Sequence, residues 1–186
     1  MSVRLDLPVS DDHLLRLSRQ NPGWQFERNA EGKLLMSPTG GESGRRSGEV
    51  FFQITLWNRR NGFGVTFDSS TGFRLPDGSC LSPDAAWVRA ARWEALTSEQ
   101  RERYLPFSPD VAFEVRSTSD PIDDLRLKMR TYVANGTVLG VLIDPRDGSV
   151  ELYRPGHERD RLERPARVRL DPELAGFTLD LEPIFA

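Results

Sequence analysis

Two short apolar stretches, each with a carboxylate inside it, most constrain how this chain can fold. They span residues 82–88 and 108–116, both begin with Ser-Pro, and their composition is typical of buried β-strands. Asp84 lies in the first stretch and Glu114 in the second. Because a buried charge is costly unless it is paired or binds a metal, we expect these two acids to belong to a polar site.

A helix that follows the second stretch supplies a basic residue near the same edge of the sheet. Residues 117–120 form a polar turn, residues 121–134 have helical spacing and include Lys128, and residues 138–143 are an apolar strand. A strand–helix–strand unit normally joins two parallel strands, so the exit of its first strand is well placed for a site. Lys128 belongs to this site or forms an ion pair with Asp124, and the spacing supports both interpretations.

The chemistry of these side chains points to a hard metal ion. Adjacent strands lie about 4.8 Å apart, so Asp84 and Glu114 can share one cation. Carboxylate oxygens suit Mg²⁺ or Mn²⁺, and no cluster of His and Cys supports zinc. A bound cation of this kind polarises a phosphodiester and activates water. Lys128 would then orient the nucleophile or stabilise charge in the transition state.

The remaining segments predict a mixed β-sheet flanked by helices, which is an α/β fold. We expect helices at residues 10–20, 42–60 and 92–104, a hairpin at 24–36, strands at 63–67 and 72–75, an outer hairpin strand at 149–153, and one or two edge strands within 154–186. Glu42 and Glu49 lie in the first part of the second helix, where the helix dipole favours acids. The alternative is that one of them reaches the metal.

Composition limits where such a chain works and what it binds. The 186 residues have a net charge of −3 and one cysteine, Cys80, which fits a reducing compartment. The sequence lacks a signal-peptide pattern, and no apolar run approaches the roughly 20 residues of a membrane span, so we expect a cytoplasmic protein without a membrane partner. The acidic balance argues against a general nucleic-acid coat, but it is compatible with an acidic metal site.

Several motifs occur together in this sequence. They are Ser82-Pro83-Asp84, residues 109–120, Leu125 with Lys128 and Tyr132, Asn135-Gly136, and residues 142–145, 37–42 and 68–73. In combination they resemble the Uma2 family of the PD-(D/E)XK nuclease superfamily, and the resemblance runs over about residues 8–185. It implies a restriction-endonuclease-like mixed β-sheet flanked by helices, with residues 1–186 forming a single domain of this type.

The resemblance also implies roles for individual residues. Asp84 matches the motif aspartate and Glu114 the acid of the signature, so both would bind the metal, with the backbone carbonyl of Val115 as a further ligand. The signature lysine is replaced by Arg116, and an arginine is a poor base at neutral pH. The lysine role would therefore move to Lys128 in the following helix.

An additional acid from the first core helix is expected by the same analogy. Glu42 is the best match for it, and Glu49 is the alternate. With this residue the expected catalytic set is Asp84, Glu114, Lys128 and Glu42.

The function that we expect is a Mg²⁺- or Mn²⁺-dependent endonuclease that hydrolyses DNA phosphodiester bonds. The first alternative is a catalytically inactive nuclease-fold module that binds nucleic acid or protein. The second is a structural or regulatory dimer, in which exposed Phe177 or Phe185 would mark the interface. A homodimer would also suit an enzyme that cuts two antiparallel strands, and the sequence leaves the oligomeric state open.

Overall fold

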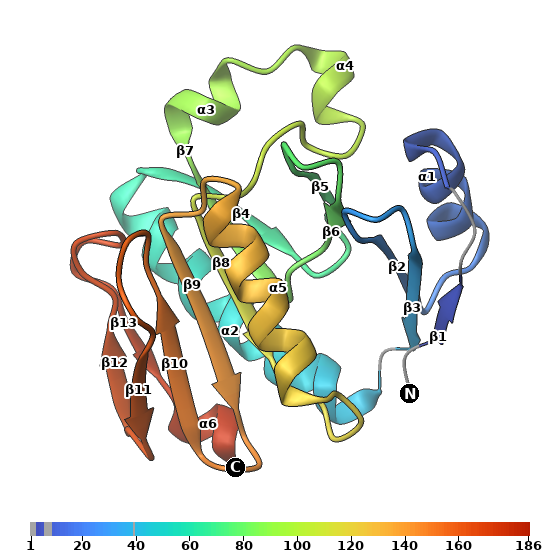
Figure 1. The fold of residues 1–186 in the computed structure, drawn as a ribbon. Coiled ribbons are helices and arrows are strands. Elements are labelled where there is room, and N and C mark those ends of the chain that lie inside the picture. Colours follow the sequence, from blue (N-terminus) through green and yellow to red (C-terminus); the bar gives the residue numbers. More distant parts are fainter. Residues whose placement is uncertain (1–2, 6–8, 39) are drawn as a thin grey trace.

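The centre of the structure, a computed structural model that describes residues 3–5, 9–38 and 40–186, is a six-stranded mixed β-sheet (Figure 1). Its strands in spatial order are β11 (Asp160–Glu163), β10 (Ser149–Tyr153), β9 (Leu139–Asp144), β8 (Val111–Val115), β7 (Ala85–Arg89) and β4 (Gly64–Asp68). The β8–β9 pair is parallel and the other neighbouring pairs are antiparallel. The helix α5 (Ile122–Ala134) connects the parallel pair, which confirms the expected strand–helix–strand unit.

A second, smaller sheet lies beside α5 and is not expected from the sequence (Figure 1). Its strands in spatial order are β1 (Val3–Leu5), β3 (Leu34–Pro38), β2 (Trp24–Arg28), β6 (Cys80–Leu81) and β5 (Phe73–Arg74). Between β6 of the small sheet and β7 of the large sheet run only residues 82–84. Asp84 therefore lies at the junction of the two sheets and precedes β7, whereas the sequence predicted it inside a strand.

The other elements cover the large sheet or connect its strands. They are α1 (Asp11–Gln20), α2 (Gly41–Asn61), α3 (Ala90–Glu94), α4 (Ser98–Arg101), β12 (Arg167–Arg169), β13 (Thr178–Asp180) and α6 (Glu182–Phe185). Ser10 caps α1, and Thr97 starts α4 with a capping box. Among the described residues, no helix combines the length and the apolar character that a membrane crossing requires.

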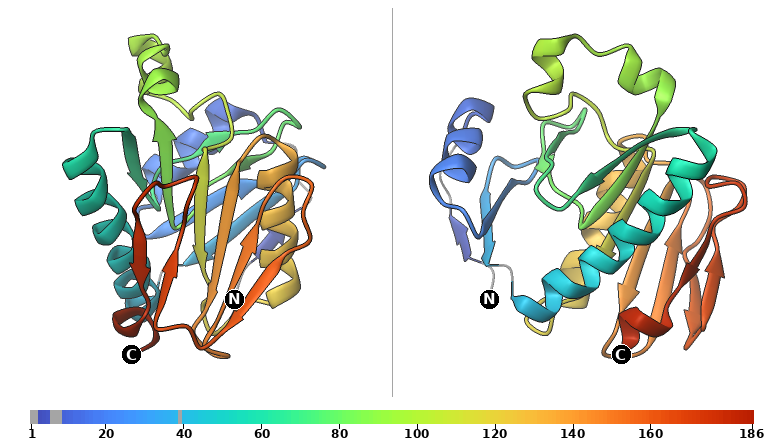
Figure 2. Two further views of the ribbon diagram at one scale, coloured as in Figure 1. Left: turned by 90° about the vertical axis from the view of Figure 1, so that its left-hand side faces the viewer. Right: turned by 180° about the vertical axis from the view of Figure 1, so that it is seen from behind.

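The two faces of the large sheet bury different partners (Figure 2). Trp87 and Phe113 point to the face covered by α2, the β12–β13 pair and α6. Ala86 and Ala112 point to the face covered by α5 and the small sheet. Because side chains alternate along a strand, Glu114 faces α5 in step with Ala112. The fold therefore turns the signature acid toward the helix that carries Lys128.

The C-terminal third corrects two expectations. β10 is not an outer strand, because β11 pairs with its free edge and all five of its residues are buried. Phe177 is 4% exposed and Phe185 packs against the core on the α2 side, so neither marks an exposed interface. The apolar residues scattered through this segment cover the second face of the sheet, a role that local sequence alone does not reveal.

A pair of glycines tests this packing. An added Cβ at Gly64 would lie 2.2 Å from the backbone oxygen of Val88, whereas one at Gly48, in the exposed part of α2, would meet nothing within 4 Å. We expect Gly64→Ala to lower the free energy of unfolding by about 2 kcal/mol. Gly48→Ala should raise it by about 0.5–1 kcal/mol, because alanine loses less backbone entropy in a helix. Urea denaturation measures both, and equal effects would contradict the packing described.

Candidate active site

A cavity of about 410 Å³ lies between the small sheet, α5 and the loop that precedes α5. Asp84, Glu114 and Lys128 all line it. Val115 lines it too, as a backbone ligand would require. The structure thus brings together the central residues proposed from the sequence, while their roles in catalysis remain predictions.

The strand register explains how the two acids meet. In the antiparallel β7–β8 pair, Ala85 is opposite Phe113 and Ala86 is opposite Ala112. Continuing this register by one residue places Asp84 opposite Glu114. The backbone N–H of Val115 donates to Oδ2 of Asp84 at 2.7 Å, so the carboxylate is fixed just beyond the end of the strand pair.

Lys128 reaches this point from α5 and binds both sheets. Its Nζ lies 2.7 Å from Oε1 of Glu114 and 2.8 Å from Oε1 of Glu27, which is on β2 of the small sheet. It also donates to the backbone oxygen of Ser82 at 3.1 Å. The phenolic O–H of Tyr132, one turn further along α5, is 3.4 Å from the same oxygen of Glu114.

The charges in this site do not balance. Three carboxylates, those of Glu27, Asp84 and Glu114, surround the one ammonium group of Lys128. Burial disfavours the ammonium ion, but Glu114 and Glu27 outweigh it, so the pKa of Lys128 lies above its usual value. Burial raises the pKa of Asp84 to about 6, against the opposing effects of the Val115 N–H and Lys128. It also raises the pKa of Glu114 well above its usual range.

This imbalance suits a divalent cation. If all four groups are ionised, the site has two excess negative charges, which one Mg²⁺ or Mn²⁺ would neutralise. Within the described part of the chain, Oδ1 of Asp84 and Oε2 of Glu114 accept no hydrogen bond from protein groups. The same described ranges contain no group of three or more His, Cys, Asp or Glu that would enclose a metal. A site with two carboxylates resembles those of Mg²⁺, which keeps several water ligands.

The additional acid expected from the first core helix does not reach the cavity. Glu42 is mostly exposed and pairs with Arg45 at 2.7 Å and Arg46 at 3.0 Å. Glu49 accepts a hydrogen bond from Gln53 and likewise does not line the cavity. Their helix contributes Ser43 and Ser47 to the cavity wall instead. The third acid of the site is Glu27, which the sequence analysis did not select.

Glu27 gives little signal in the sequence. It stands in the alternating stretch of residues 24–28, where a polar residue normally faces water. In the structure the residue is 9% exposed, because the small sheet turns this face toward α5. Its Oε1 also accepts the backbone N–H of Ser82 at 2.6 Å. Only the packing of the two sheets, which local sequence does not encode, identifies it.

Arg116, at the position of the signature lysine, does not line the cavity. Its Nη1 lies 2.7 Å from Oδ2 of Asp144 at the end of β9, and its Nε donates to the backbone oxygen of Asp120 at 3.0 Å. Ser117 N–H donates to the Asp120 carboxylate and closes the same turn. Arg116 therefore fixes the loop between β8 and α5, and it neither pairs with Glu114 nor lines the cavity.

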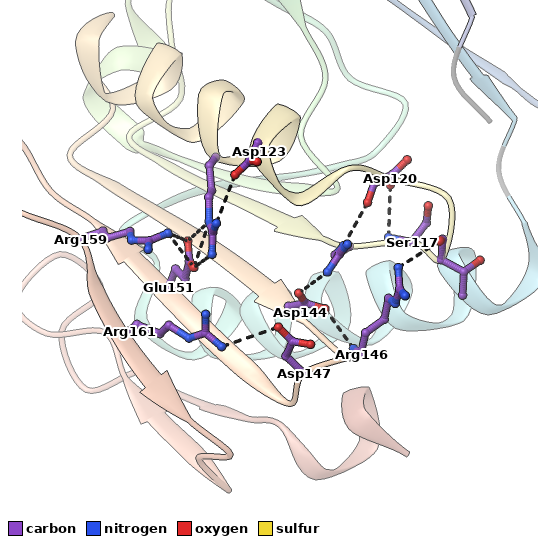
Figure 3. Close-up of polar contacts among 12 residues, drawn as sticks. Ser117, Asp120, Asp123, Asp144, Arg146, Asp147, Glu151, Arg159 and Arg161 are labelled. Atoms are coloured by element: carbon purple, nitrogen blue, oxygen red, sulfur yellow. Dashed lines mark hydrogen bonds and ion pairs between the residues drawn. The ribbon is translucent and has the colours of Figure 1, made fainter.

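A second buried acid, Glu151, contacts α5 outside the cavity, and arginine side chains neutralise its charge (Figure 3). Glu151 on β10 is 2% exposed and pairs with Arg126 at 2.7 Å and Arg159 at 2.9 Å. It also accepts the O–H of Tyr153 at 2.6 Å. Although burial opposes it, these donors hold the pKa of Glu151 below its usual value. This cluster stabilises the helix, whereas the cavity site retains unneutralised negative charge.

Comparisons with known proteins bear on the family and the fold. The Uma2 family model, described as "Putative restriction endonuclease", matches residues 11–182. A crystal structure from Anabaena variabilis ATCC 29413, described as a "putative nuclease belonging to DUF820", is similar with a TM-score of 0.79 and 20% identity, over 96% of this chain and 98% of that one. This likeness confirms the expected fold class. A DrdV–DNA complex has a TM-score of 0.39 and 18% identity, over 67% of this chain and 11% of that one. No curated protein matches the sequence.

Burial of the Asp84 carboxylate predicts that Asp84→Asn stabilises the metal-free protein above pH 6. The pKa of Asp84 is about 6 in the folded chain against an ordinary 3.8, so folding favours its protonated form and stability falls as the pH rises through this window. Asparagine keeps an acceptor for Val115 N–H but never ionises. After allowance for partial exposure, we expect a gain on the order of 1 kcal/mol at pH 7.5 and none near pH 4.

Chemical denaturation of both proteins in EDTA across this pH range measures the difference. Asp123→Asn, which changes a mostly exposed acid of α5, is the control and should show no such trend. A destabilised Asp84→Asn at pH 7.5 would contradict the raised pKa of Asp84.

Proposed function

Because this chain belongs to the Uma2 family, we propose that it is a metal-dependent endonuclease that hydrolyses phosphodiester bonds of DNA. The observation that carries the proposal is the pair Asp84 and Glu114 in one cavity with Lys128, with more negative charge than the lysine can neutralise. Perturbed acids in a cavity are typical of catalytic sites. Asp84 and Glu114 lie at the edge of the sheet where β7 begins and β8 ends, and sites of α/β proteins often form at the exit of a strand such as β8.

The cavity wall supports metal dependence in particular. It includes two lysines, Lys33 and Lys128. Against them stand six acids: Glu27, Glu31, Asp84, Glu114, Asp120 and Asp124. No arginine of the described residues lines it. A phosphodiester is itself an anion, so such a wall repels it unless cations occupy the site. Binding of substrate here therefore requires the divalent ion, which favours an enzyme over a metal-independent nucleic-acid binder.

The roles of the side chains follow from their geometry. Asp84 and Glu114 would hold the cation through the oxygens that accept no protein hydrogen bond, with the backbone carbonyl of Val115 as a further ligand. A divalent ion bound there supplies Lewis acidity and lowers the pKa of a bound water. Lys128 is protonated at neutral pH, so it acts as a hydrogen-bond donor and a charge, and not as a general base. In that form it orients the attacking water or stabilises charge on the phosphoryl oxygens.

We expect the wild-type protein to cleave plasmid or single-stranded DNA in Mg²⁺ or Mn²⁺ and to lose this activity in EDTA. Asp84→Asn and Glu114→Gln should each reduce the cleavage rate by at least about 100-fold, because each removes a ligand charge. Glu42→Gln and Asp123→Asn change acids outside the cavity and should retain activity.

Three results would count against the proposal. Equal residual cleavage by every variant would indicate a contaminating nuclease. Loss of activity in Glu42→Gln would restore that residue to the site. Absence of both cleavage and calorimetric metal binding, together with DNA binding that persists in EDTA, would favour the inactive binding module.

A separate experiment tests the location of the catalytic lysine. We expect Lys128→Met to abolish cleavage and the further substitution Arg116→Lys to leave it abolished, although it recreates the usual signature. The reason is that residue 116 is engaged with the Asp144 carboxylate and the backbone oxygen of Asp120, and does not itself line the cavity. Single-turnover rates of the two variants measure this, with circular dichroism as the check of folding. A recovery of about tenfold or more would show that position 116 can reach the site.

A further inference from the structure

Every hydrogen of the Lys128 ammonium group is already engaged. A lysine ammonium has three N–H donors and no acceptor. In this site it has three acceptors, which are Glu114 Oε1 at 2.7 Å, Glu27 Oε1 at 2.8 Å and the backbone oxygen of Ser82 at 3.1 Å. In this arrangement Lys128 has no hydrogen left for a water or a phosphate in the cavity. One of its acceptors must release it before it can act on a substrate.

Glu27 also holds the segment that delivers Asp84. Its Oε1 accepts the N–H of Ser82 at 2.6 Å, and Nε2 of Gln25, two residues earlier on β2, donates to the Ser82 oxygen at 3.0 Å. Asp84 follows Ser82 by two residues, and its Oδ2 accepts the backbone N–H of Val115. One strand of the small sheet therefore positions both Lys128 and the segment that leads to Asp84.

We propose that Glu27 is a positioning residue that keeps Lys128 in place while Glu114 binds the metal, so that one hydrogen of Lys128 is released toward the substrate. This inference rests on the proposed function. Of the three acceptors of Lys128, Glu114 is the one assigned to the cation, and a carboxylate that neutralises a metal attracts an ammonium less strongly. Glu27 and Ser82 then hold Lys128 at two points, and the third N–H faces the cavity. Without the charge of Glu27, Lys128 would depend on Glu114 and compete with the cation for it.

The alternative role for Glu27 is that of a third metal ligand, and a double-mutant cycle separates the two. The variants are Glu27→Gln, Lys128→Met and their combination, and Mn²⁺ affinity is measured by calorimetry. A positioning residue acts through Lys128, so Glu27→Gln should weaken Mn²⁺ binding about tenfold in the wild-type background. In the Lys128→Met background the same substitution should change the affinity by less than about threefold. Equal weakening in both backgrounds would make Glu27 a ligand and overturn the proposal.

A matched control comes from the same hairpin. Glu31 lines the same cavity but is exposed, and Glu31→Gln makes the same change of charge without touching Lys128. Glu27→Gln should lower kcat about 10-fold to 100-fold with little change in KM for DNA, because Glu27 contacts no substrate. Asp123→Asn, which changes an exposed acid outside the cavity, should leave kcat unchanged, and Glu31→Gln should affect kcat less than Glu27→Gln does. A Glu27→Gln enzyme with normal kcat would overturn the proposal.

A spectroscopic measurement keeps this inference distinct from the proposed function. In the metal-free wild type, three acceptors should protect the Lys128 ammonium from exchange and give it a ¹H–¹⁵N signal at neutral pH. That signal should disappear in Glu27→Gln and persist in Glu31→Gln. A signal that persists in Glu27→Gln would show that Glu27 does not hold the lysine, whether or not the protein cleaves DNA. Absence of Mn²⁺ binding and cleavage in the wild type would instead refute the proposed function.

Discussion

The buried ammonium group of Lys128 is the interaction on which the site and the junction of the two sheets depend. Its partners come from β2 of the small sheet, from β8 of the large sheet and from the segment between β6 and β7. Removing one partner from a buried ion pair typically costs about 3–5 kcal/mol, because a charge is left uncompensated. Here such a loss would affect two sheets at once. The charge that the proposed chemistry uses is therefore also a structural tie.

The two acidic clusters on either side of α5 illustrate a division between stability and function. Glu151 has two arginines and a tyrosine and keeps a low pKa. The cavity acids share one lysine, and burial raises the pKa of Asp84 and Glu114. The ion pairs of Glu151 fix α5 in position from one side. The other side of α5 can then carry the cavity site, whose buried acids lower stability when they are ionised. Proteins commonly accept such a local cost at functional sites.

Much of the candidate site could be predicted from the sequence, because its elements are local. Asp84 and Glu114 stood out as charges in apolar stretches, and the strand–helix–strand unit placed Lys128 near them. Glu27 could not be found in this way, since it is buried only by the packing of one sheet against another. Glu42 was expected from the family resemblance, which implies an additional acid on the first core helix. The structure places Ser43 and Ser47 of this helix in the cavity wall, and not Glu42. Phe177 and Phe185 were expected at an exposed interface, but they pack on the α2 side of the large sheet. Such packing against elements far away in the sequence leaves no periodic pattern in the local sequence.

The order in which Glu27, Glu114 and Lys128 occur along the chain has a consequence for how the molecule is made. Glu27 is synthesised long before Lys128, and the strand β8 with Glu114 lies between them in the chain. A ribosome-bound chain that has not yet released α5 has the segments of the small sheet and the acids Glu27, Asp84 and Glu114, but not the lysine that joins them. Long-range contacts of this kind form late, after loop closure over most of the intervening chain. Completion of the site therefore waits for α5, so that a nascent chain that ends before this helix lacks an assembled centre.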